Sequence, residues 1–216
     1  ENSKVKLNTS NSSLRLGFQR ICIGLFLKLC IADELARLND IAFNYEFLNL
    51  SSVDAWTMAF GFGLQIYFDF SAYSHMAIGI SKIIGLPIRE NFSFPYLSKS
   101  PTEFWRKWHI SLSSWVKDYL YSFLNLKLPK WLNGSIPLIL TWALMGLWHG
   151  SSWRFIIWGI INGIFILIHR LFKTYLFKFD SIRKIFNPFI SWIVTLSFIM
   201  STWIYFRSTT WDQANT

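Results

Sequence analysis

Two apolar runs near the end of the sequence constrain the fold most, because each is long enough to cross a bilayer as a helix. Residues 153–172 and residues 188–206 are dominated by aliphatic and aromatic side chains. A helix needs about 20 mainly apolar residues to span the hydrocarbon core. Of all residues, 52% are hydrophobic and 15% are charged, whereas soluble domains carry about 25% charged residues. The sequence therefore predicts an all-α, polytopic membrane helical bundle.

Three further apolar runs extend this pattern toward the N-terminus. Residues 16–32 just reach spanning length, residues 53–86 are too long for one span, and residues 136–147 are short for a full span. The long run is predicted to divide near Asp69. A carboxylate there is costly in a membrane unless it is paired or hydrated. Asp69 either caps a helix at the division or lines a site, and the pattern leaves both interpretations open.

The net charge of +9 reflects membrane topology and not nucleic-acid binding. The basic residues lie between the apolar runs, as they do in the cytoplasmic loops of membrane proteins. Residues 170–184 hold five Lys or Arg residues and one acidic residue, so this loop is predicted to be cytoplasmic. We therefore expect a multi-pass protein of the cell inner or plasma membrane, surrounded by membrane lipid and without a nucleic-acid partner.

The apolar run 142–150 ends in His149 followed by Gly150. An ionisable side chain in such a run normally faces a bundle interior or a wet cavity, and it often marks a functional site. The competing interpretation is a histidine that only hydrogen-bonds a neighbouring helix. Because the run 136–147 is short, we expect this segment to end partway through the membrane, as a re-entrant helix does.

A second histidine, His109, lies in a segment rich in tryptophan. Four aromatic residues recur there at helical spacing and predict one amphipathic helix: Phe104, Trp108, Trp115 and Tyr119. Ser100 or Thr102 is expected to cap its start. A basic, Trp-rich helix of this kind typically lies in the membrane interface, and this pattern alone favours an interfacial His109.

The residues suggest acid–base chemistry without a metal. No spacing among the four histidines fits a metal site, and the sequence has no GxSxG nucleophile motif. What remains is two histidines with hydroxyls such as Ser111 nearby. A neutral imidazole is a suitable general base near pH 7. It can deprotonate an acceptor hydroxyl that then attacks an acyl carbonyl, so no protein nucleophile is needed.

Several motifs in order resemble the membrane-bound O-acyltransferase (MBOAT) family, and within it the bacterial alginate O-acetylation branch. They cover about residues 15–206 and read QIYFDFS at 65–71, ENF at 90–92, PY at 95–96, EFWRKWHISLS at 103–113, DYLY at 118–121 and GLWHG at 146–150. The resemblance implies a many-helix membrane fold with short re-entrant and interfacial helices around a central tunnel. It also implies that His149 is the catalytic residue and His109 the second active-site histidine. Trp148, Trp105, Asp69 and Ser111 are further candidates for the tunnel wall.

Two differences between this sequence and the branch limit which residue roles the resemblance implies. The branch usually has Tyr-Ser-Asp where this sequence has Tyr73-Ser74-His75, so His75 receives no role. Residues 122–125 replace a Pro-Leu-Gly-Gly loop. Family members are roughly twice as long, and we expect residues 1–216 to be one membrane domain from a longer protein, without its N-terminal spans and C-terminal end.

The function implied is O-acyl transfer, with acetyl as the expected group and hydroxyls of an envelope or extracellular polysaccharide such as alginate as acceptors. The donor is expected to be a co-substrate, either an acyl thioester or a carrier protein, with no bound cofactor. An acyl carrier and a periplasmic or extracellular acetyltransferase are the expected partners. The alternatives are D-alanyl transfer to teichoic acid from a carrier protein, and a non-catalytic membrane scaffold. A catalytic protein needs His109 and His149 to line one cavity, whereas a scaffold does not.

Overall fold

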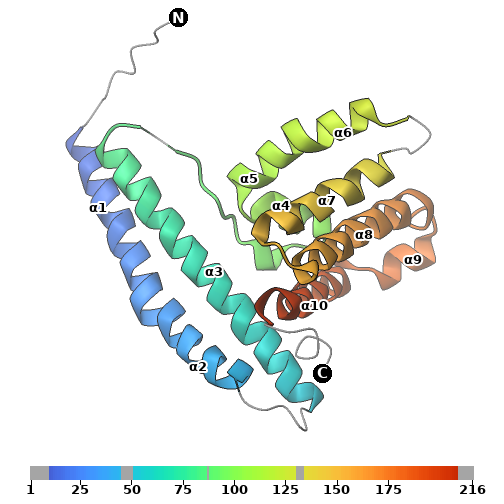
Figure 1. The fold of residues 1–216 in the computed structure, drawn as a ribbon, viewed down its shortest axis with the longest axis horizontal. Helices are drawn as coiled ribbons and strands as arrows, with labels where there is room; N and C mark the ends of the chain where they lie inside the picture. The colour runs from blue at the N-terminus through green and yellow to red at the C-terminus, as the bar shows by residue number, and fades with distance from the viewer. Residues whose placement is uncertain (1–9, 45–50, 87, 130–133, 209–216) are drawn as a thin grey trace, which may run out of the picture. The chain divides into compact units, whose positions relative to one another are not determined.

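The structure is a computed structural model that describes residues 10–44, 51–86, 88–129 and 134–208. Within these residues the regular structure is helical, and no strand is present (Figure 1). The chain divides into two compact units. The first comprises residues 1–46 and 60–91, and the second comprises residues 47–59 and 92–216. The predicted all-α class is confirmed.

In the first unit, α1 (Asn11–Phe26), the π-helical segment η1 (Leu27–Ala32) and α2 (Asp33–Asn44) follow one another without interruption. They run antiparallel to the part of α3 (Ser52–Ile83) that belongs to this unit, residues 60–83 (Figure 1). Small residues permit a close approach, because a Cβ at Gly24 would overlap the carbonyl oxygen of Ala72. Close helix packing through small residues is the usual way in which membrane helices associate.

The predicted division of residues 53–86 at Asp69 is wrong, because α3 is a single helix of 32 residues. Asp69 lies in its middle and is paired instead of capping a helix. The Nζ atom of Lys28 is 2.7 Å from Oδ1 of Asp69 and 2.9 Å from Oδ1 of Asp33. This pairing compensates the carboxylate, so the helix can continue through it.

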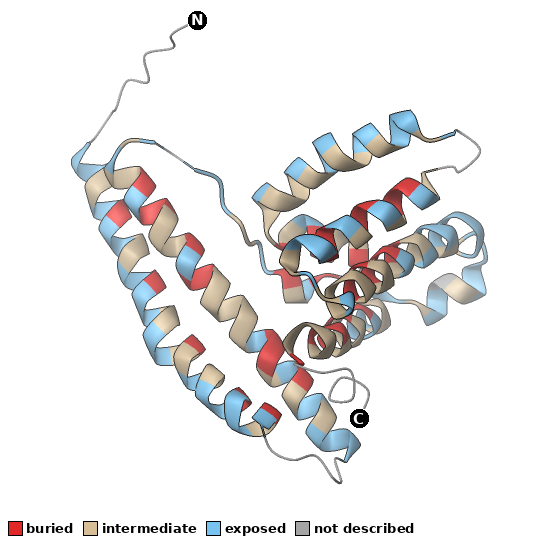
Figure 2. Ribbon diagram, in the orientation of Figure 1, coloured by how far each residue is buried: buried red, intermediate tan, exposed pale blue. Residues whose placement is uncertain are grey.

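The second unit is built around α7 (Ser135–His149), α8 (Trp153–Tyr175) and α10 (Pro188–Arg207). Buried residues gather on these three helices (Figure 2). Helices α7 and α8 form a tight hairpin with glycines at the contact. A Cβ at Gly146 would overlap the carbonyl oxygen of Phe155, and a Cβ at Gly159 would overlap that of Trp142. The position of His149 at the end of α7 is therefore fixed by α8.

Among the described residues, two helices are long and apolar enough to cross a membrane by length and composition: Trp153–Leu176 and Pro188–Arg207. They coincide with the predicted spans at 153–172 and 188–206. Helix α7 is apolar but shorter, in agreement with the short run predicted at 136–147. Between α8 and α10, the predicted basic loop contains one short helix, α9 (Asp180–Ile185).

The single amphipathic helix predicted around residues 104–119 is wrong. Helix α4 (Pro101–Lys107) ends before Trp108, and α5 (Ile110–Trp115) begins after His109. The chain then continues through η3 (Val116–Tyr121) into α6 (Ser122–Lys127), and η2 (Pro95–Leu97) precedes α4. The Ser100 side chain accepts a hydrogen bond from the amide of Glu103, so this predicted cap is confirmed.

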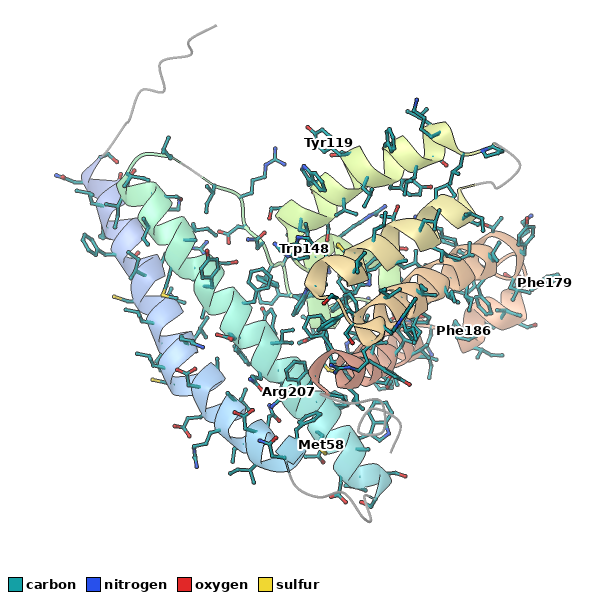
Figure 3. The ribbon with its side chains drawn as sticks, in the orientation of Figure 1. Met58, Tyr119, Trp148, Phe179, Phe186 and Arg207 are labelled. Carbon is teal, nitrogen blue, oxygen red and sulfur yellow. The ribbon has the colours of Figure 1, made fainter. Side chains whose placement is uncertain are left out.

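The break divides the predicted aromatic stripe into two parts. Phe104 and Trp108 are buried, whereas Trp115 and Tyr119 are 55% and 66% exposed. Figure 3 shows Tyr119 on the outer side of the helix that begins with α5. Only the first half of the stripe therefore belongs to the core of the second unit, and the second half presents its aromatic rings outward.

Candidate active site

His149 is the last residue of α7, and three aromatic rings from other helices surround its imidazole. The ring centroids of Trp158 on α8 and Phe206 on α10 lie 5.4 and 5.0 Å from that of His149. Both rings meet the imidazole nearly at right angles, at 89° and 78°. Phe155 on α8 lies 6.4 Å away. We call Phe155, Trp158 and Phe206 the histidine cage.

The cage continues into a layer of tryptophans in the interior of the second unit. Trp158 stacks on Trp203 at 5.9 Å, and Trp105 lies 5.7 Å from Trp158 and 4.6 Å from Trp142. All four tryptophans are at most 8% exposed. Aromatic packing of this density excludes water and holds side chains in fixed rotamers. The surroundings of His149 are therefore apolar and preorganised.

His109 occupies an unusual backbone position at the break between α4 and α5. Its φ and ψ are 44° and 57°, in the left-handed region, and its carbonyl oxygen accepts from the Ser113 amide. Such a conformation costs a non-glycine residue about 1–3 kcal/mol and is often found at functional sites. The strain is maintained by Trp108, which packs on Phe104 at 5.6 Å and whose carbonyl oxygen accepts from the Ser113 hydroxyl.

Both histidines adjoin the tryptophan layer of the second unit. Trp108, the residue before His109, lies 5.2 Å from Trp203, and Trp158, which meets the His149 imidazole, stacks on the same Trp203. His109 is half-buried, and burial lowers the pKa of its imidazole. A lowered pKa favours the neutral form of the imidazole.

The remaining predicted site residues lie in different surroundings. Trp105 is buried in the tryptophan layer, whereas Trp148 is 64% exposed at the end of α7 (Figure 3). Ser111 is exposed in the first turn of α5. Asp69 belongs to the first unit and pairs with Lys28. Their assignment to a tunnel wall stays a prediction.

Sequence reasoning did not select the cage residues. Phe155, Trp158 and Phe206 come from two apolar spans in which aromatic residues are frequent, so their residue type did not distinguish them from residues that face lipid. A usable signal was the one-turn spacing of Phe155 and Trp158, which places both on the face of α8 nearest the α7–α8 turn. Phe206 has no comparable signal, because it lies 57 positions after His149.

Sequence reasoning also gave no role to His75, which lies in a polar cluster of the first unit. The Nη1 atom of Arg20 is 2.9 Å from Nδ1 of His75, and Arg20 also forms an ion pair with Glu90. In the described part of the chain, no group of three or more His, Cys, Asp or Glu residues is placed to hold a metal ion.

The sequence profile of the MBOAT, or membrane-bound O-acyltransferase, family matches residues 1–208. The chain belongs to the MBOAT family. In this MBOAT chain the caged His149 lies in the motif GLWHG, and the strained His109 lies in FWRKWH. Membership in this family, together with the apolar helices α8 and α10, makes the chain part of a membrane protein.

Curated relatives of this MBOAT chain carry the names of O-acetylating and D-alanylating enzymes. It is 41% identical over 198 residues to the protein of Azotobacter vinelandii named probable alginate O-acetylase AlgI, covering 92% of this chain and 38% of the relative. It is 38% identical to the peptidoglycan O-acetyltransferase of Helicobacter pylori, covering 94% of this chain and 38% of the relative. Identity to the teichoic acid D-alanyltransferase of Bacillus subtilis is 30%, covering 75% of this chain and 42% of the relative.

These alignments also show how much of such a protein is present. The chain spans less than two fifths of the length of the first two relatives. The two histidines and the cage therefore belong to the part of an MBOAT protein that this sequence contains.

Proposed function

We propose that the full-length protein is a multi-pass enzyme of the cell inner membrane that transfers acetyl groups to hydroxyls of an envelope or extracellular polysaccharide. The observation that carries the proposal is the arrangement of His149 in its cage of aromatic rings. The names of the relatives support acetyl transfer, since the O-acetylases are 38–41% identical and the D-alanyltransferase 30%.

In the proposed reaction, His149 is the general base. Its neutral imidazole accepts the proton of an acceptor hydroxyl as the hydroxyl oxygen attacks the acyl carbonyl carbon. The tetrahedral intermediate then collapses, the carbon–sulfur bond of the thioester breaks, and the proton passes from the imidazolium to the leaving thiolate. The products are an ester and a thiol, so atoms and charges balance. General-base catalysis of this kind contributes about 10²–10⁴ in rate.

The cage supports this role by orientation and by exclusion of water. Rings at nearly 90° to the imidazole restrict its rotation, and restricted geometry favours attack. Exclusion of water keeps the acyl donor from hydrolysis. In this proposal His109 positions donor or acceptor without itself taking the proton.

The donor is proposed to be an acyl thioester, free or on a carrier protein, and no bound cofactor is needed. The proposed partners are the polysaccharide, an acyl carrier and a periplasmic or extracellular acetyltransferase. D-Alanyl transfer to teichoic acid is the alternative, because the relative that carries that name shares the family.

Radiolabelling of living cells distinguishes these functions. Cells that produce the full-length protein, and that convert free acids into activated donors themselves, are supplied in parallel with labelled acetate or labelled D-alanine, and ester-linked label in the polymer fraction is measured after mild base. We expect acetyl label that depends on the protein. Ester-linked D-alanine without acetyl would support the alternative, and the absence of both labels would support a scaffold.

A further inference from the structure

The second unit contains a pocket of about 430 Å³ that neither histidine lines. It lies between α4, α5, η3, α7 and α8, and Leu138, Trp142 and Ile166 form part of its apolar wall. This volume is within the range of small-molecule sites, roughly 300–1,000 Å³. The pocket is thus large enough for a ligand and separate from the site proposed for catalysis.

Three basic residues from three different elements line this pocket: Arg106 of α4, Lys117 of η3 and Arg170 of α8. None of its lining residues is acidic. Within the described part of the chain, neither Arg106 nor Arg170 has a carboxylate partner, and Lys117 lies 3.8 Å from Asp118. By contrast Lys107, next to Arg106 in sequence, is paired with Glu103 at 2.7 Å. The pocket therefore keeps a concentrated positive charge that an anion would neutralise.

The side of the membrane on which the pocket is expected indicates the kind of anion that it binds. Arg170 begins the basic stretch 170–184, whose charge predicts a cytoplasmic location. Basic pockets between membrane helices on that side bind acidic lipid head groups. We propose that this pocket holds the phosphate of an acidic phospholipid of the cytoplasmic leaflet, with the apolar wall against the adjoining part of the lipid. The pocket volume accommodates a head group, and the acyl chains remain in the bilayer.

Native mass spectrometry of the full-length protein tests this proposal after exchange into vesicles of phosphatidylglycerol and phosphatidylcholine in equal amounts. We expect retained phosphatidylglycerol. Arg106→Gln with Arg170→Gln should weaken its retention by roughly tenfold or more, and replacing both by Lys should restore most of it. Both arginines are exposed, so these changes leave the core intact. Lys173→Gln, an exposed cation on α8 that does not line the pocket, should stay within about twofold of wild type.

Three results would overturn the proposal. The first is equal retention of phosphatidylglycerol and phosphatidylcholine. The second is a loss in the Lys173→Gln protein as large as in the double variant, which would indicate diffuse attraction to the leaflet. The third is displacement of the bound lipid by millimolar phosphopantetheine but not by inorganic phosphate, which would assign the pocket to a soluble phosphate-bearing thioester.

Discussion

The Trp158 indole meets the His149 imidazole at right angles, with their ring centroids 5.4 Å apart. Trp158 is 1% exposed and lies in the second turn of α8, so its own position is fixed by packing. The imidazole is therefore held by a rigid neighbour on a different helix. The proposed role of His149 as a base can therefore be tested by changing His149 itself, without changing the residues that hold it.

Substitution of His149 by Gln should reduce acetyl transfer by about 10²-fold or more, because it removes the proposed base with little change in volume. The measurement is acetyl incorporation into polysaccharide by membranes with matched amounts of the full-length protein. The matched control is His169→Gln, since His169 is a half-buried histidine of α8 outside the cage. If the His149→Gln protein retained more than about a tenth of wild-type transfer, His149 would not be an essential base.

Removal of a cage ring should reduce transfer without unfolding the protein. Phe206→Leu removes the ring 5.0 Å from His149, and the misplaced imidazole should lower the rate by roughly tenfold or more. Phe198→Leu on the same helix removes a ring that stacks on Phe165 at 3.6 Å and should leave transfer per folded molecule nearly unchanged. Equal loss in both variants would mean that α10 packing matters and the cage does not.

Because the backbone at His109 is strained, two substitutions can separate the contribution of its ring to transfer from the contribution of its backbone conformation to stability. Glycine adopts the left-handed region readily, whereas alanine pays about 1–2 kcal/mol there. We therefore expect His109→Gly to melt at a higher temperature than His109→Ala, while both lose transfer through loss of the imidazole. Thermal denaturation in detergent and the acetyl assay measure the two effects. Wild-type acetyl transfer in either variant would contradict an active-site role for His109 and would favour the interfacial role.

The ion pair between Lys28 and Asp69 favours a structural role for Asp69 over the place on the tunnel wall that the sequence suggested. Asp69→Asn or Lys28→Gln alone leaves a charge unpaired and should lower thermal stability, and the double variant should recover part of the loss. Transfer per folded molecule should stay near wild type in all three. A selective loss of transfer in Asp69→Asn, at unchanged stability, would instead place Asp69 on the substrate path.

Membrane topology is open to a labelling experiment. Ser181 lies in α9 within the basic stretch 170–184 and is exposed. We expect Ser181→Cys, in a full-length protein without other cysteines, to react with a membrane-impermeant maleimide only after the cytoplasmic side becomes accessible. Reaction in intact cells would reverse the predicted orientation.

The sequence predicted the two long apolar helices α8 and α10, because long apolar runs determine membrane helices largely by themselves. It failed at Asp69, whose partner Lys28 is 41 residues away and cannot be inferred from local pattern. It failed again at His109, where helical spacing continues through the break. There the burial of Trp108 against Phe104 and Trp203 overrides local periodicity.

The sequence selected the two histidines of the candidate site, whose roles stay a prediction, and did not select the residues that surround them. His149 and His109 were recognisable because ionisable groups are rare in apolar segments. Phe155, Trp158 and Phe206 were not, because their role depends on which faces of α8 and α10 meet the end of α7. Which helix faces meet depends on the tertiary structure and cannot be inferred from the local sequence pattern.

The glycine-packed hairpin of α7 and α8 has a consequence for depth in the bilayer. Helix α8 has 23 residues and is therefore about 35 Å long, close to the roughly 30 Å of the hydrocarbon core. Trp158 lies roughly 8 Å along this length from the start of α8. A bilayer-spanning α8 would therefore place the imidazole beside Trp158 below the membrane surface that is opposite the basic stretch 170–184. A thinner bilayer makes a long helix tilt, and the hairpin moves as one piece. In the proposed reaction, lipid thickness would therefore set how far the acceptor must enter the membrane to reach His149.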